Sequence, residues 1–170
     1  MKENEDFDVV NSLDSVISSK PRSEVYGKKL PHRIVHLFVF NKAGDMLLQK
    51  RAKGLSFCPL YWCTAAAGHV KAGEYGEEAA VRECKEELGF TAEPVLLFKD
   101  LDYFDSGKHH KILYSFKTVR NGNFKPNPAE VEEIRFFSIE EIQHLVTKRE
   151  KIHPETLFIL TKHFGIKTKT

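Results

Sequence analysis

Three glutamates near the middle of the chain have the side-chain type and the spacing for metal-ion chemistry. Glu83, Glu86 and Glu87 stand at positions i, i+3 and i+4. In a helix, which turns about 100° per residue, their carboxylates share one face within an arc of roughly 100°. Like charges at that spacing repel, so a cation over the face would stabilise it. Carboxylate oxygens are preferred ligands of Mg²⁺ and Mn²⁺, and we therefore expect a site for one of these ions.

The surrounding segment, residues 68–90, has the pattern of a loop, a helix and a second loop. Cys84 and Leu88 fall on an apolar arc next to the acidic one, which suits burial against a sheet. Arg82 lies beside the acidic arc, where it can pair with Glu74 and hold the preceding loop against the helix. For the acidic string alone, a solvated surface helix would be the alternative interpretation.

The complete spacing over residues 68–90 resembles the Nudix box. The residues that carry the resemblance are Gly68, Glu74, Arg82, Glu83, Glu86, Glu87 and Gly89. Cys84 stands where an aliphatic residue is more usual in that family, and a buried thiol fills the same place as a small hydrophobe. The resemblance implies an enzyme that binds Mg²⁺ or Mn²⁺ and hydrolyses a diphosphate linked to another group. The Nudix box does not identify the group that is linked to the diphosphate in the substrate.

The resemblance also implies a role for each matching residue. The expected metal ligands are the Gly68 carbonyl, Glu83, Glu86 and Glu87, and the expected catalytic residues are Glu74, Arg82, Glu83 and Glu86. Among these, Glu74 and Arg82 would be the orienting pair. The general base would be Glu83 or Glu86, with Glu130 and Glu132 as competitors, since relatives place the base either in the box or on a distant loop. We favour the box.

A broader likeness over roughly residues 8–90 points to the Nudix subgroup that includes isopentenyl-diphosphate isomerase and its hydrolase relatives. In that subgroup the strand ending LLQKRA and the following loop supply cations to the diphosphate, which singles out Arg51 and Lys53 as substrate-binding residues. Isomerase chemistry needs a cysteine before the Gly-His pair and an acidic partner on a later strand. Here those positions hold Ala67 and, within 109–111, His-His-Lys. Alanine cannot transfer a proton, so hydrolysis is favoured over isomerisation. A nucleotide-binding module without catalysis is a further alternative.

Composition sets the general class. The 170 residues, with 41% hydrophobic content, are enough for one domain spanning 1–170 with a substantial core. A net charge of +2 without a long run of Lys or Arg argues against a nucleic-acid polymer as partner. The resemblance implies a small-molecule diphosphate as the substrate. Three cysteines without framework spacing suit free thiols in a cytoplasmic protein. No stretch approaches the ~18 apolar residues of a membrane span. Exposed strand edges could support a homodimer.

The elements expected around the box form an α/β protein, and the resemblance implies a Nudix-type α/β/α sandwich with a mixed sheet. An N-terminal extension over 1–30 would contain a short strand pair, 8–11 and 15–17, and a helical turn at 23–25. Further expected strands and closing helices follow the hydrophobic patterns and the capping signals. The strands are 32–40, 46–51, 63–67, 93–101, 111–119 and 134–137, with a polar link at 102–110, and the two helices begin at 138 and 154.

Overall fold

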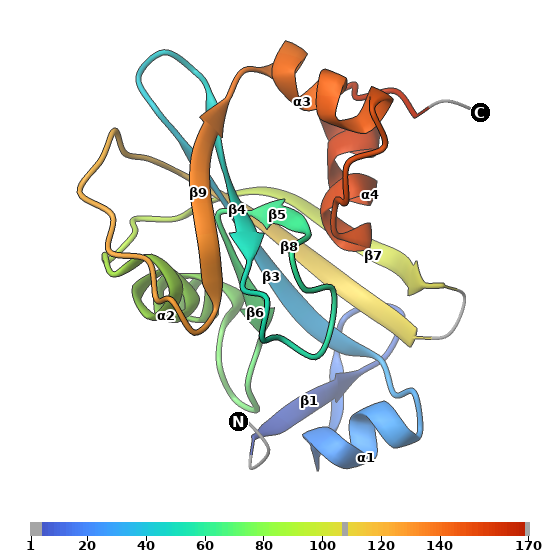
Figure 1. The fold of residues 1–170 in the computed structure, drawn as a ribbon. Coiled ribbons are helices and arrows are strands. Elements are labelled where there is room, and N and C mark those ends of the chain that lie inside the picture. Colours follow the sequence, from blue (N-terminus) through green and yellow to red (C-terminus); the bar gives the residue numbers. More distant parts are fainter. Residues whose placement is uncertain (1–4, 107–108, 169–170) are drawn as a thin grey trace.

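A mixed sheet crosses the middle of the molecule (Figure 1). The computed structural model describes residues 5–106 and 109–168, and within these residues seven strands join in the sheet. They are β3 (His32–Phe40), β4 (Met46–Arg51), β5 (Trp62–Thr64), β6 (Ala66–His69), β7 (Val95–Asp105), β8 (His109–Val119) and β9 (Val131–Phe137). The order is β5-β4-β3-β8-β7, with β6 also on β3 and β9 on β4. The β3–β8 pair is parallel and the others are antiparallel.

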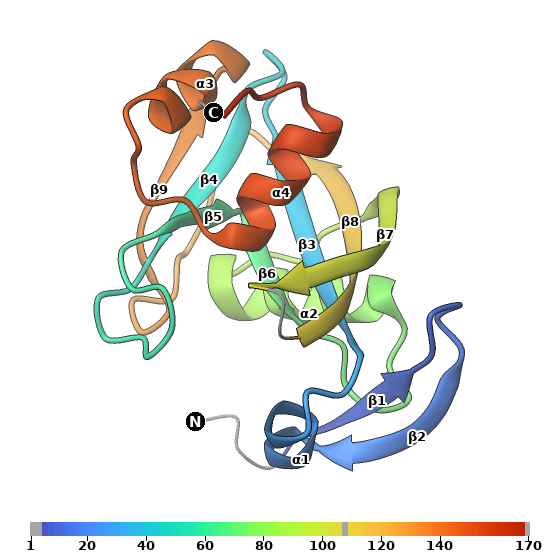
Figure 2. The same cartoon turned by 90° about the vertical axis from the view of Figure 1, so that its right-hand side faces the viewer.

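Helices cover both faces of this sheet. Helix α2 (Gly76–Leu88) lies on one face, whereas α3 (Ile139–Thr147) and α4 (Pro154–His163) lie on the other (Figure 2). The α/β/α sandwich with a mixed sheet is therefore confirmed. No helix in the described part of the chain combines the length and the apolar character that crossing a bilayer requires.

The central strand β3 shows why the sheet is buried on both faces. Side chains of a strand alternate between faces, and β3 is apolar on both. Val35 and Leu37 pack in the core beneath α2, whereas Ile34 and Phe38 pack in the core beneath α4. Strand β3 therefore anchors both layers, and α2, the helix predicted within residues 68–90, has a rigid surface on which to lie.

The helix ends follow the local sequence. Gly89 ends α2 with φ +73°, a left-handed conformation that glycine adopts without strain. At the start of α3, the Glu141 amide donates to Ser138 Oγ at 3.2 Å and the Ser138 amide donates to Glu141 Oε2 at 2.9 Å. This is the capping box that the residues 138–141 predicted.

The N-terminal lobe, residues 5–30, consists of β1 (Asp6–Val10), β2 (Val16–Pro21) and α1 (Arg22–Gly27). It has its own small core around Phe7, Val9 and Val25. The expected strand pair exists, but its second strand continues to residue 21 and the helix begins at residue 22. Pairing with β1 extends β2 through polar residues of low strand propensity, so the tertiary contact overrides the local preference.

The prediction of a polar link at 102–110 is wrong, because most of this segment belongs to two strands. Strand β7 continues to Asp105 and β8 begins at His109, while residues 107 and 108 lie outside the described residues. The antiparallel β7–β8 ladder carries two irregularities, and this pairing keeps the polar residues in strand conformation.

Two other strands also differ from expectation. The segment 63–67, expected as one strand, forms two strands, β5 and β6. Strand β9 begins three residues earlier than expected, at Val131.

Candidate active site

The three glutamates of α2 share one region but differ in exposure. Glu83 and Glu87 are buried, with only 2% and 4% of their surface exposed, whereas the Glu86 side chain is 37% exposed. The acidic face formed by Glu83, Glu86 and Glu87 therefore extends from the contact between α2 and the sheet to the protein surface, and it does not project wholly into solvent. Two buried carboxylates at this spacing are costly unless positive charge compensates them.

Gly68 makes room for one of these carboxylates. A Cβ atom at residue 68 would lie 2.1 Å from Oε1 of Glu83, a distance that side chains cannot reach without displacement. Glu83 thus occupies the space beside the β6 backbone that a larger residue would fill. The glycine of the motif is required here by close packing, since Gly68 has no left-handed φ.

Arg82 supplies the compensating charge. Its Nε and Nη2 donate to the two oxygens of Glu74 at 2.8 and 2.9 Å, and Nη2 also donates to the His69 carbonyl at 2.9 Å. Nη1 lies 2.5 Å from Glu83 and 3.6 Å from Glu86. Burial lowers the pKa of Arg82, but the contacts with Glu74 and Glu83 outweigh it and raise the pKa above its ordinary value. Arg82 is therefore permanently charged and joins the loop to the acidic face.

Glu74 is held ionised by the same contact. Burial raises its pKa, but the hydrogen bonds from Arg82 and from the Lys71 amide outweigh burial, so the pKa lies below 4.5. The Glu74–Arg82 pair that the spacing predicted is present, and it is bidentate. Because both oxygens of Glu74 face donors, the loop before α2 has a defined position relative to the helix.

Gln49 is a site residue that the sequence reasoning missed. It is buried on β4 and its Nε2 donates to Oε2 of Glu87, while its own Oε1 has no hydrogen-bond partner within the described residues. Opposite it on β5 lies Cys63, whose pKa burial and the nearby Glu87 charge raise to about 12. The available signal was weak, because Gln49 directly follows the apolar residues 46–48 and is the first of the polar residues that end strand 46–51. Gln49 orients Glu87 from the sheet side.

The cations expected to bind substrate lie at the end of β4. Arg51 donates from Nε and Nη2 to the Phe57 carbonyl, at 3.2 and 3.1 Å, and lies close enough to the Cys63 thiol to oppose the rise of its pKa. Lys53 is exposed, and its amide lies 3.4 Å from Oε2 of Glu132. Arg51 therefore lies near the Gln49–Glu87 contact, and Lys53 lies further out beside the alternative base.

The donor set fits a hard divalent cation, although the side chains are arranged around Arg82. The candidate ligands offer only oxygen atoms, which suits Mg²⁺ or Mn²⁺ better than softer metals. Among the described residues, no three His, Cys, Asp or Glu side chains converge as a preformed metal site. Nη1 of Arg82 faces both Glu83 and Glu86, so a bound cation would compete with this guanidinium for the two carboxylates.

The positions that matter for isomerase chemistry lie on β6 and β8. Ala67 stands opposite His36 in the β3–β6 pair. Lys111 is buried on β8, and its Nζ lies 2.7 Å from Oε1 of Glu155 and 3.4 Å from Asp105. Burial raises the pKa of Glu155, but the His36 hydrogen bond and the Lys111 charge hold it well below 4.5. Lys111, one of the three residues 109–111 expected at the later-strand position, is thus a cation in an ion pair with a carboxylate.

His32 makes stability dependent on pH. Its side chain is completely buried, and burial lowers its pKa from 6.5 to about 4. Between these values the unfolded chain binds a proton that the folded chain does not, so stability is lost as the pH falls below 6.5. From pH 7 to pH 5 we expect His32 to lower the free energy of unfolding by about 2 kcal/mol. Urea unfolding at both pH values measures this.

His32→Phe is the matching variant for that measurement, because phenylalanine keeps a ring and cannot titrate. Its loss of stability between pH 7 and pH 5 should be smaller than that of the wild type by the same amount, about 2 kcal/mol. Equal losses in the two proteins would show that the acid sensitivity comes from other groups.

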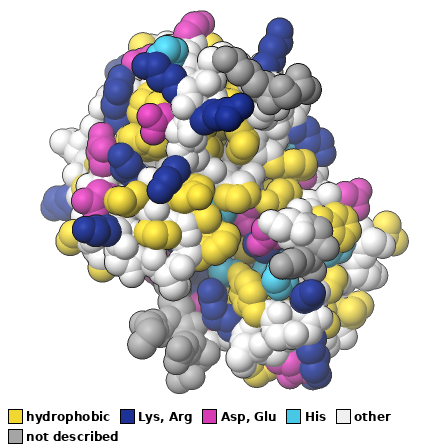
Figure 3. Space-filling model, turned by 45° about the vertical axis from the view of Figure 1, so that its right-hand side comes forward, with side chains coloured by type: hydrophobic (Ala, Val, Ile, Leu, Met, Phe, Trp, Pro, Cys, Tyr) yellow, Lys and Arg dark blue, Asp and Glu magenta, His cyan; other side chains and the backbone are white. Residues whose placement is uncertain are grey.

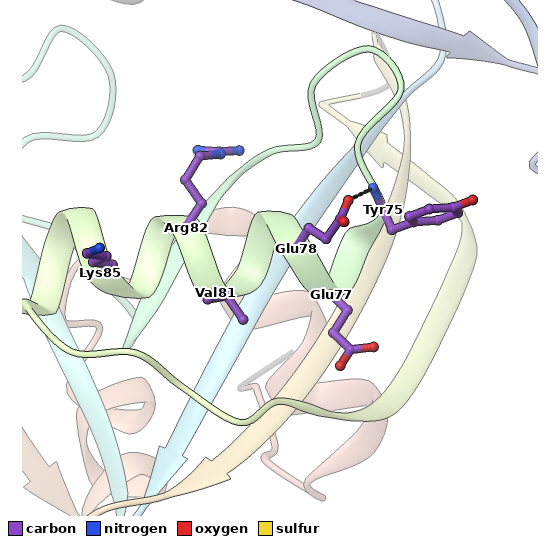
Figure 4. A pocket seen from close by; sticks show the side chains of 6 residues that line it. All are labelled: Tyr75, Glu77, Glu78, Val81, Arg82 and Lys85. Carbon is purple, nitrogen blue, oxygen red and sulfur yellow. Dashed lines mark hydrogen bonds between the residues drawn. The ribbon is translucent and has the colours of Figure 1, made fainter.

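A shallow hollow of about 560 Å³ lies on the outer face of α2 (Figure 4). Its lining comes from the helix and the residue before it: Tyr75, Glu77, Glu78, Val81, Arg82 and Lys85. Figure 4 shows the Tyr75 amide donating to Glu78 at the helix start, a bond of 2.9 Å. Glu83, Glu86 and Glu87 do not line this hollow, and we assign it no substrate.

The chain is similar to known proteins in sequence and in fold. A family model of the NUDIX domain matches residues 30–158. The chain is 30% identical to an uncharacterized Nudix hydrolase of Listeria innocua, covering 98% of this chain and 97% of that protein. It is 28% identical to isopentenyl-diphosphate Delta-isomerase 2 of Photorhabdus laumondii, covering 85% and 84%. A crystal structure from Deinococcus radiodurans superposes with a TM-score of 0.79 at 20% identity, covering 93% and 98%.

Proposed function

The chain belongs to the Nudix hydrolase family, and from that premise we propose that it is a Mg²⁺- or Mn²⁺-dependent enzyme that cleaves a diphosphate linkage in a nucleoside diphosphate derivative or similar small molecule. The observation that carries the proposal is the Glu83 carboxylate, buried against the Gly68 backbone and held by Arg82. Burying this carboxylate costs free energy, and a bound divalent cation would offset that cost. Buried charged groups of this kind are typical of functional sites.

The residues that would hold the cation are Glu83, Glu86, Glu87 and the carbonyl of Gly68. When bound, a divalent cation would neutralise the diphosphate and lower the pKa of an attacking water. The protein supplies the positions: Gln49 orients Glu87 from β4, and Arg82 orients Glu83 from the loop side. Arg51, at the end of β4, would contact the diphosphate, and Lys53 would add charge at the rim.

The general base would be Glu83 or Glu86. Glu86 is the more accessible of the two, and accessibility favours proton transfer with water. Glu130 and Glu132 remain the alternative, and Oε2 of Glu132 lies 3.4 Å from the amide of Lys53, an expected substrate-binding residue. Glu130→Gln and Glu132→Gln, measured separately, distinguish the two possibilities, because one of them should lower kcat as much as Glu86→Gln only if the base lies outside the box.

The isomerase alternative is less well supported. A carbon-protonating enzyme needs two proton-transferring groups across its substrate. Ala67 supplies none, so one of the two groups is missing. Within 109–111, where the second group would lie, Lys111 forms a buried ion pair with Glu155. The likeness to a named isomerase therefore extends to the scaffold, whereas Ala67 and residues 109–111 carry different chemistry.

The test is a substrate panel. The protein is incubated with Mg²⁺ and nucleoside diphosphate derivatives, and with isopentenyl diphosphate in a separate arm. We expect release of phosphate or nucleotide from at least one derivative, its loss on adding EDTA, and its return with excess Mg²⁺ or Mn²⁺. Formation of the allylic isomer without cleavage of any diphosphate would instead identify an isomerase.

A further inference from the structure

The N-terminal lobe is hydrogen-bonded to the loop that leads into α2. We define this box loop as residues 69–75. The Ala72 amide donates to the Asp6 carbonyl at 2.8 Å, and the Gly73 amide donates to Oδ2 of Asp8 at 3.0 Å. Two consecutive amides of the box loop are thus bound to strand β1, which lies some 65 residues earlier in the chain.

Asp8 is built into the lobe so that it can accept this bond. Alternation along β1 sends Phe7 and Val9 into the small core of the lobe and Asp8 to the other face. Asp8 is only 6% exposed, and its Oδ1 accepts a hydrogen bond from Ser19 Oγ at 2.7 Å. Nη1 of Arg33 lies 3.8 Å from Oδ2. A carboxylate held by these neighbours presents a fixed acceptor to Gly73.

The Gly73 amide is connected to the acidic face of α2 through Glu74 and Arg82. Gly73 has φ +73°, which sets the direction of the chain just before Glu74. Glu74 holds the guanidinium of Arg82 with both oxygens, and Arg82 contacts Glu83. A continuous series of contacts therefore links Asp8 to Glu83. Asp8 itself lies outside the set of candidate metal ligands and substrate-binding residues.

A second set of contacts holds the start of the box loop. The ring of His69 stacks on Phe7, with centroids 4.5 Å apart, and its Nε2 lies 2.5 Å from the Tyr26 hydroxyl. Nδ1 lies 3.3 Å from Nη1 of Arg22, which can only donate, so Nε2–H donates to Tyr26. Figure 3 shows histidines gathered where the lobe meets the body of the protein. The His69 carbonyl, in turn, accepts from Arg82.

We propose that Asp8 is a positioning residue for hydrolysis, and that the N-terminal lobe holds the box loop in the conformation in which Glu74 and Arg82 align Glu83. This inference rests on the proposed function. Loss of a group that hydrogen-bonds a metal ligand directly typically lowers activity by about 10- to 100-fold. Asp8 acts through Glu74 and Arg82, and we expect an effect near the lower end of that range.

The test compares Asp8→Ala with Asp8→Asn. Alanine removes the acceptor, so we expect kcat to fall by roughly 10-fold or more with KM unchanged, and amide hydrogen exchange of residues 70–75 to accelerate. Asparagine retains a carbonyl oxygen that can accept from Gly73. Asp8→Asn should therefore keep wild-type exchange in the box loop and most of the activity.

Asp14→Asn is the matched control. Asp14 is the other buried carboxylate of the lobe, and it contacts Arg33, Lys99 and Tyr114 on the sheet instead of the box loop. Asparagine tolerates its φ of +63°. This variant should weaken the lobe without lowering kcat.

Two results would overturn the proposal: wild-type exchange of residues 70–75 in Asp8→Ala, or an equal loss of kcat in Asp14→Asn. A wild-type protein that cleaves nothing in the substrate panel contradicts the proposed function instead. In that case the exchange measurement, which requires no substrate, still decides whether Asp8 holds the box loop.

Discussion

Glu86→Gln should lower kcat by about 10²- to 10⁴-fold, the range expected when a catalytic base or an essential charge is removed. Glutamine keeps the length and shape of the side chain but can neither take a proton nor neutralise a cation. Because the Glu86 side chain is 37% exposed, its substitution should leave the free energy of unfolding nearly unchanged. Steady-state kinetics with Mg²⁺ and the best substrate of the panel, together with urea unfolding, measure both quantities.

Glu77→Gln provides the control on the same helix. Glu77 is exposed in the first turn of α2 and lines the hollow on the outer face, so the substitution removes the same charge from the opposite side. Its kcat should equal that of the wild type. Similar losses in the two variants would mean that the net charge of the helix matters and that Glu86 has no specific role. Wild-type activity in Glu86→Gln would contradict the site as a whole.

Gly68→Ala should lower kcat by roughly 10²-fold without preventing folding, since small displacements of a catalytic group have effects of that size. The added Cβ would lie 2.1 Å from Oε1 of Glu83 and 2.2 Å from its carboxyl carbon, so the carboxylate must move. The displaced group would also lose its contact with Arg82. Kinetics, together with Mn²⁺ titration followed by electron paramagnetic resonance, would show a weaker metal affinity as well as a slower reaction.

Gly122→Ala is the comparison for this substitution. A Cβ at residue 122 meets no heavy atom within 4 Å, and Gly122 has no left-handed φ, so alanine should be tolerated with wild-type kinetics. If Gly68→Ala also retained wild-type kcat and Mn²⁺ affinity, the close approach of Glu83 to the β6 backbone would have no functional consequence. The proposed placement of Glu83 in the metal site would then be wrong.

Local patterns predicted those parts of the fold that depend on neighbours in the sequence. The periodicity around Cys84 and Leu88 predicted α2 and its buried side, and Gly89 predicted its end. The Glu74–Arg82 contact followed from the spacing, because a helix brings an arginine in its second turn back toward the loop before it. The link at 102–110 was misread because a polar segment at a sheet edge has no periodic signal of its own.

Residue types and spacing thus determined an acidic helical face, the arginine beside it and the layered α/β fold, since all three follow from the geometry of one chain segment or its hydrophobic pattern. Only the tertiary structure decided that Glu83 fills the space beside Gly68, that Gln49 contacts Glu87, and that Asp8 accepts a hydrogen bond from the Gly73 amide. Each of these contacts joins elements that are distant in the sequence. Their existence depends on how the sheet, α2 and the N-terminal lobe pack together, and a periodic pattern carries no information about that.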